Sequence, residues 1–176
     1  MSKDIKIEAF EYLLSRLIDW KNQYSNNNDL GILKVLKLTF FVSAAGTDQN
    51  SKETLLDDIF NNFVAMPYGH VESDVYKYIK NGLLSNVSIN NNTSKLSESF
   101  NILNYDSNVR NKIDKSVQLL KEINPELINL SSFDLVDLSH SWYSWQKYFN
   151  EAKSKGKLST VIPVDEIKKE DKIYQI

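Results

Sequence analysis

Residues 33–45, LKVLKLTFFVSAA, consist almost entirely of residue types that proteins bury. The apolar positions recur at three- and four-residue steps, which predicts a helix with this inward face: Ile32, Leu33, Leu36, Phe40 and Ser43. Only Lys34 and Lys37 interrupt the apolar character of this helix, and both lie on one side of it. Asp29 is placed to cap the first turn and Gly46 to end the last one. A helix this apolar is expected at the centre of the fold, with neighbours on several faces.

Two long amphipathic helices are predicted on either side of this segment. The first covers residues 3–24 and has one apolar stripe: Ala9, Phe10, Leu13, Leu14, Leu17 and Ile18. The second begins near Ser107 and stops before Pro125, with its own stripe: Val109, Ile113, Val117, Leu120 and Ile123. Shorter helices are predicted over residues 73–80, after Ser131 or Ser132, and after Pro163.

The segment between residues 86 and 101 is rich in Asn and Ser and poor in apolar side chains. It is predicted to be a solvated loop with room for a short hairpin. The chain shows no internal repeat and no linker long enough to divide it. The sequence therefore predicts a compact, mostly α-helical bundle in a single domain over residues 1–176, with its core between about 8 and 170 and a short β-hairpin.

Composition excludes several classes of protein. With 21 basic and 23 acidic residues, the net charge of −2 provides no overall positive field for nucleic acid. The absence of cysteine rules out disulfides, thiolate catalysis and cysteine-based metal sites. The N-terminus lacks the apolar region of a secretory signal, and no window resembles the roughly 20 apolar residues of a membrane span. A soluble, cytoplasmic protein is expected.

The two histidines, His70 and His140, are the obvious candidates for acid–base or metal chemistry. Neither belongs to a metal-binding, nucleophile or phosphate-loop motif, and five glycines leave little material for a phosphate-binding loop. We therefore expect no catalytic residue, no metal and no cofactor. An enzyme remains an open hypothesis only if the two rings share a cleft within hydrogen-bond reach of one substrate.

Five aromatic residues crowd the segment from 142 to 149. On a helix, Trp142, Trp145 and Phe149 align at three- and four-residue steps and are expected in the core. Tyr143 and Tyr148 point elsewhere, where amphipathic rings commonly anchor a protein interface.

Residues 64–79, VAMPYGHVESDVYKYI, pass from an apolar run through a turn to the start of a helix. Gly69 is expected to supply a backbone conformation that other residues resist, with Tyr68 packed beneath the turn. A polar ring beside such a turn, as at His70, is suited to contact a partner.

Three motifs of the chain resemble those of the Panacea domain of SocA-like antitoxins and related phage-associated proteins, and they follow one another along the chain in the family's order. The central motif, Ala-x-x-Tyr-Gly-Pro-Val followed by Val-Tyr, is matched by Ala65, Tyr68, Gly69, Val71, Val75 and Tyr76, with His70 in place of the proline. A Leu-Ser-x-x-His stretch with a later tryptophan corresponds to Leu138, Ser139, His140 and Trp145, after Leu130 and Ser131. A weaker match to Lys-Leu-Leu-Tyr-Phe is found at Leu36, Lys37, Leu38 and Phe40.

The resemblance implies a non-catalytic antitoxin that binds a cognate toxin encoded by a neighbouring gene; SocA-like members can also hand the toxin to an energy-dependent protease. The expected partner-binding residues are Tyr68, Gly69, His70, His140, Tyr143, Trp145 and Tyr148. The alternative is a phage or mobile-element protein that uses the same domain against a host factor, with no toxin gene beside it.

Overall fold

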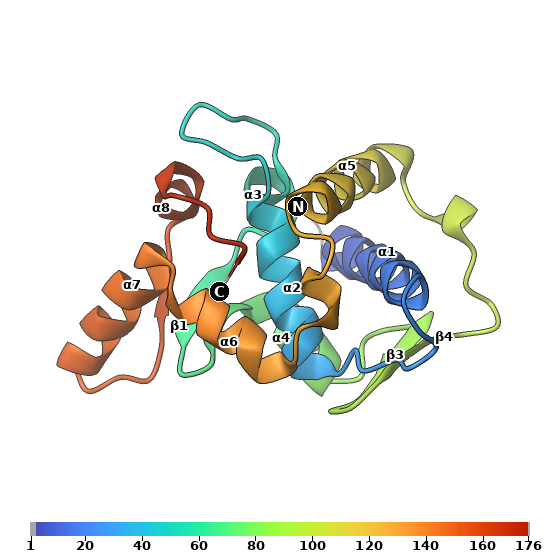
Figure 1. Ribbon diagram of the computed structural model, residues 1–176, viewed down its shortest axis with the longest axis horizontal. Helices are drawn as coiled ribbons and strands as arrows, with labels where there is room; N and C mark the ends of the chain where they lie inside the picture. Colours follow the sequence, from blue (N-terminus) through green and yellow to red (C-terminus); the bar gives the residue numbers. More distant parts are fainter. Residues whose placement is uncertain (1–2, 176) are drawn as a thin grey trace.

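The computed structural model describes residues 3–175 and is mostly helical, which confirms the predicted fold class (Figure 1). The α-helices are α1 (Lys3–Asn22), α2 (Ile32–Ala44), α3 (Leu55–Asp58), α4 (Ser73–Lys80), α5 (Ser107–Ile123), α6 (Ser132–His140), α7 (Tyr143–Ser154) and α8 (Val164–Lys169). Two short 3-10 helices are η1 (Ile102–Asn104) and η2 (Leu127–Asn129). The strands are β1 (Phe63–Met66), β2 (Gly69–Glu72), β3 (Val87–Ile89), β4 (Ser94–Leu96) and β5 (Thr160–Val161). In this part of the chain no helix is both long and apolar enough to cross a membrane.

Helix α2 lies at the centre of the molecule, between α1 and α5 on one side and α6, α7 and α8 on the other (Figure 1). It contacts α3, α5, α6 and β2, and 11 of its 13 residues are buried. The prediction of a central helix is therefore confirmed. Lys34 and Lys37 are buried as completely as their apolar neighbours. Each ammonium consequently needs a polar partner inside the protein.

The predicted cap of α2 is wrong. Gly31 occupies the N-cap position and makes no side-chain hydrogen bond there. Asp29 instead accepts from the Nζ of Lys34 at 2.8 Å, because an ammonium removed from water needs a charged partner to offset its lost hydration. The first amide of the helix, that of Ile32, donates to the carbonyl of Asn90 at 3.0 Å. The Asn90 carbonyl, from a neighbouring loop, thus takes the place of a side-chain cap.

Two antiparallel hairpins accompany the helices. Strands β3 and β4 pair within the Asn-rich segment, at the place where the sequence predicts a short hairpin. Strands β1 and β2 form a second hairpin, and β5 adds to β1 to give a sheet of order β2-β1-β5. This sheet was not predicted, because strands of two to four residues are too short to show a periodicity. The structure therefore contains more sheet than the single hairpin expected.

The other helix boundaries follow local chemistry. Helix α4 covers residues 73–80 as predicted, and α5 begins at Ser107 and ends before Pro125. Ser131 caps α6 through a reciprocal pair of hydrogen bonds with Asp134, which confirms that predicted start. Pro163 stands immediately before α8.

Candidate partner-binding groove

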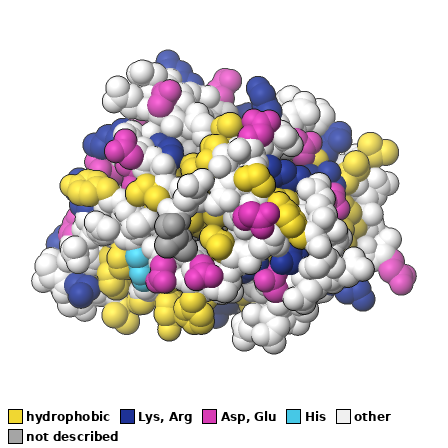
Figure 2. Space-filling model, in the orientation of Figure 1, with side chains coloured by type: hydrophobic (Ala, Val, Ile, Leu, Met, Phe, Trp, Pro, Cys, Tyr) yellow, Lys and Arg dark blue, Asp and Glu magenta, His cyan; other side chains and the backbone are white. Residues whose placement is uncertain are grey.

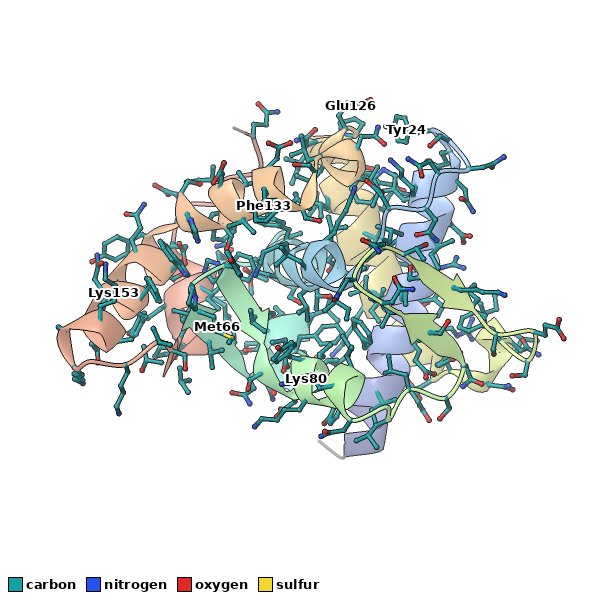
Figure 3. All side chains as sticks on the ribbon, turned by 90° about the horizontal axis from the view of Figure 1, so that it is seen from below. Tyr24, Met66, Lys80, Glu126, Phe133 and Lys153 are labelled. Atoms are coloured by element: carbon teal, nitrogen blue, oxygen red, sulfur yellow. The ribbon has the colours of Figure 1, made fainter. Side chains whose placement is uncertain are left out.

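A groove of about 780 Å³ opens between the start of α2, the β1–β2 hairpin, α4 and α6. Its lining is mostly apolar and consists of Ile32, Leu33, Leu36, Met66, Pro67, Tyr68, Val71, Tyr76, Lys80, Asn91, Ser132 and Phe133. Figure 3 looks onto this side of the molecule, where Phe133 from α6, Met66 from β1 and Lys80 from α4 lie around the opening. Figure 2 shows hydrophobic side chains gathered along the lower edge of the molecule below α6.

Two aromatic rings at the rim of the groove are unusually exposed. Tyr68 is 58% exposed and Phe133 63% exposed, and their ring centroids lie 6.2 Å apart in an edge-to-face arrangement. Such rings, grouped around an apolar hollow, are typical of surfaces that another molecule covers. The expectation that Tyr68 packs beneath its turn is wrong, since α6 and Lys37 already fill the space below Gly69.

The tip of the β1–β2 hairpin is held by side chains from α6 and α7. The Nε2–H of His140 donates to the Pro67 carbonyl at 3.0 Å, and the indole N–H of Trp145 donates to the Met66 carbonyl at 2.8 Å. The two rings stack on each other with centroids 3.8 Å apart. Because a carbonyl only accepts, the proton of His140 must be on Nε2. Partial burial lowers its pKa, which favours this neutral form.

Gly69 is required at the end of this turn for two reasons. Its φ of +99° lies in the region that residues with a side chain rarely adopt. A Cβ at this position would also lie 2.3 Å from the Oγ of Ser139 and 2.8 Å from its Cβ. The expectation of a special backbone conformation is confirmed, and the close approach of α6 adds a second constraint.

Beneath the turn, His70 belongs to a buried polar chain. The Oγ of Ser139 lies 2.9 Å from the His70 amide and 2.7 Å from Nδ1, while the Oγ of Ser144 lies 2.8 Å from Nε2. The backbone amide of Ser144 donates to the Glu170 carboxylate at 3.1 Å, and the Ser139 hydroxyl, which accepts from the His70 amide, keeps its own proton to donate to Nδ1. We therefore assign the His70 proton to Nε2, which donates to Ser144, so that Nδ1 accepts from Ser139. Burial, and secondarily the nearby Lys37 charge, holds the pKa of His70 well below its usual value.

Lys37 contributes a cation to this same region. Its side chain is fully buried, and its Nζ donates to the carbonyl of His70. Burial lowers its pKa to about 7, and none of the described carboxylates forms an ion pair with it. Sequence reasoning missed this role of Lys37, because the lysine was read only as an interruption of an apolar helix.

The structure brings together five of the seven predicted partner-binding residues at one place. Tyr68, Gly69, His70, His140 and Trp145 all lie at or directly beneath the hairpin tip. Only Tyr68 among them presents a largely exposed side chain. His70 has no exposed surface, so in this conformation its side chain supports the turn from beneath. Its ring stacks on Phe40 of α2 at 3.6 Å, which explains its burial.

The remaining two predicted residues, Tyr143 and Tyr148, lie on α7 and do not line the groove. Tyr143 is 61% exposed, whereas Tyr148 is partly buried and packs against the core. Of the predicted core stripe, Trp142 is fully buried, and Trp145 and Phe149 are partly buried.

Phe133 and Lys80 are groove residues that the sequence reasoning missed. A signal existed for Phe133, because it stands two residues before the buried Leu135 and so lies on the opposite side of a helix. A large aromatic ring off the apolar stripe indicates an exposed contact.

The two histidines do not share a substrate cleft. Neither lines the groove. Both ring nitrogens of His70 bind serine hydroxyls, and Nε2 of His140 binds a backbone carbonyl. Among residues 3–175, no cluster of three side chains suited to metal ligation occurs. The described geometry thus gives the enzyme hypothesis no support.

Comparison with known families gives one match. The family model described as "Antitoxin SocA-like, Panacea domain" matches residues 35–146, which is more than half of the chain. The matched range includes most of α2, the β1–β2 hairpin, α4 and α6, and hence all of the groove lining except Ile32 and Leu33. No curated protein and no solved structure matches this chain.

Proposed function

Because this chain belongs to the SocA-like Panacea-domain family, we propose that it is an antitoxin that neutralises a cognate protein toxin by direct binding. The observation that carries this proposal is the apolar groove with Tyr68 and Phe133 exposed at its rim. Burying such rings against a partner is favourable, and a rigid, pre-formed surface loses little entropy on binding. The clamp of His140 and Trp145 on the hairpin supports that rigidity.

In this proposal the protein acts in the cytoplasm without catalysis, and the toxin is encoded by a neighbouring gene. The toxin is held in the groove, and Tyr143 and Tyr148 on α7 offer a second contact beside it. We propose, as a second step, that the chain hands the bound toxin to an energy-dependent protease. Measuring the half-life of the toxin with and without this chain would separate degradation from simple occlusion.

Growth rescue tests the proposal directly. The chain is expressed together with the product of the adjacent gene, and growth and complex capture are scored. We expect rescue by the natural sequence and loss of rescue by the Tyr68→Ala/Phe133→Ala variant. Leu103→Ala is the matched control, because Leu103 is 74% exposed in η1 and does not line the groove.

A harmless neighbouring gene product, or one that remains toxic beside soluble antitoxin, would contradict the proposal. The alternative function, a phage or mobile-element protein directed at a host factor, would then be the one to pursue. Tyr143→Ala and Tyr148→Ala show whether α7 contributes to the interface.

A further inference from the structure

We infer that the partner segment entering the groove is an amphipathic helix, with large apolar side chains on one face and a carboxylate that pairs with Lys80. This inference rests on the proposed function, because it assumes that a protein occupies the groove. It is carried by two separate observations: three backbone carbonyls around the groove and the main-chain groups of His70 are already hydrogen-bonded, and Lys80 is the single charged residue of the lining.

The hairpin wall offers few backbone partners to an incoming chain. The carbonyl of Met66 accepts from Trp145, and that of Pro67 accepts from His140. On the opposite wall, the carbonyl of Asn90 accepts from the first amide of α2. These three carbonyls are therefore already engaged, and the side chains of the lining face the occupant.

The outer edge of β2 is closed in the same way. His70 lies opposite Ala65 in the hairpin, and its amide and carbonyl point away from β1. The amide donates to Ser139 and the carbonyl accepts from Lys37, so this edge cannot pair with an added strand. An extended segment would leave its own backbone groups unpaired against an apolar surface, whereas a helix satisfies them internally.

Lys80 determines the charge that the helix must carry. It is the one charged residue in the lining, it is exposed, and it forms no ion pair within residues 3–175. Its Nζ lies over the ring of Tyr76, 5.4 Å from the centroid, at the α4 end of the groove. On the α6 side, Asp134 and Asp137 are exposed and would repel an acid. A carboxylate of the partner helix is thus favoured at the α4 end.

The test measures the affinity of the purified product of the adjacent gene for the full chain and three variants. Lys80→Glu is expected to weaken binding about tenfold or more, and Lys80→Arg to retain most of it. Lys153→Glu is the matched control, because Lys153 is also a helical lysine over an aromatic ring, 5.9 Å from the centroid of Phe149. It lies in the last turn of α7, ten residues after Tyr143 and outside the groove (Figure 3). We expect its affinity to stay within about twofold.

A photo-crosslinking residue in place of Phe133 then identifies the partner segment. We expect a segment with helical apolar spacing and an Asp or Glu, whose replacement by Lys restores binding to the Lys80→Glu variant. An extended segment, a segment without an acid, or Lys80→Glu binding as tightly as Lys153→Glu would overturn the inference and leave the antitoxin function standing. No binding by the natural sequence would overturn both.

Discussion

At position 69, any side chain would clash with Ser139 of α6. Gly69→Ala places a methyl group against Ser139 at a φ of +99°, so strain and overpacking add. We expect a loss of about 3 kcal/mol in the free energy of unfolding, measured by urea denaturation. Gly82→Ala is the control, since Gly82 has a φ of +65° but open space around it. It should lose only about 1 kcal/mol. Equal losses would show that contact with α6 is unimportant.

Lys37 makes stability rise with pH. Burial lowers its pKa from 10.5 to about 7 in the folded protein. Between these values the unfolded chain holds a proton that the folded chain releases, so folding becomes more favourable as pH increases. From pH 7 to pH 9 we expect a gain of about 2 kcal/mol in the free energy of unfolding. In Lys37→Met this gain should disappear, and an unchanged gain in that variant would contradict the assignment.

At the scale of elements, the β1–β2 hairpin depends on its clamp. Trp145→Phe keeps a ring to stack on His140 but removes the donor to the Met66 carbonyl. We expect a loss of about 1 kcal/mol and faster hydrogen exchange confined to the hairpin amides. Trp142→Phe is the comparison, because its indole donates to the Ile173 carbonyl instead. If both variants loosen the hairpin equally, the clamp is not specific.

The helices could be predicted because their signals are local. The start of α6 follows from its capping residue Ser131, and α5 begins at Ser107, where a periodic apolar stripe starts directly after the capping residue Asp106. The β1–β2 hairpin could not be predicted, because it depends on tertiary partners: β5 along one edge, and Ser139 and Lys37 along the other. None of these partners is near the hairpin in sequence.

At the scale of the whole molecule, the groove is assembled from parts of the chain that are separated in sequence: the start of α2, the β1–β2 hairpin with α4 directly after it, and α6. Sequence reasoning selected the residues that hold the hairpin tip, such as His140 and Trp145, because they belong to recognisable motifs. It missed Phe133 and Lys80, whose importance arises only when α6 and α4 are placed on opposite sides of the hollow. The side chains that support the hairpin tip were thus easier to predict than those that line the groove.

If this groove binds the toxin, as we propose, the affinity of the groove variant is the most direct test. The measurement compares the natural chain, Tyr68→Ala/Phe133→Ala and Leu103→Ala for binding to the product of the adjacent gene, with thermal unfolding recorded for each. We predict an affinity loss of about a hundredfold for the groove variant alone, with folding intact. An unchanged affinity in that variant would contradict the claim.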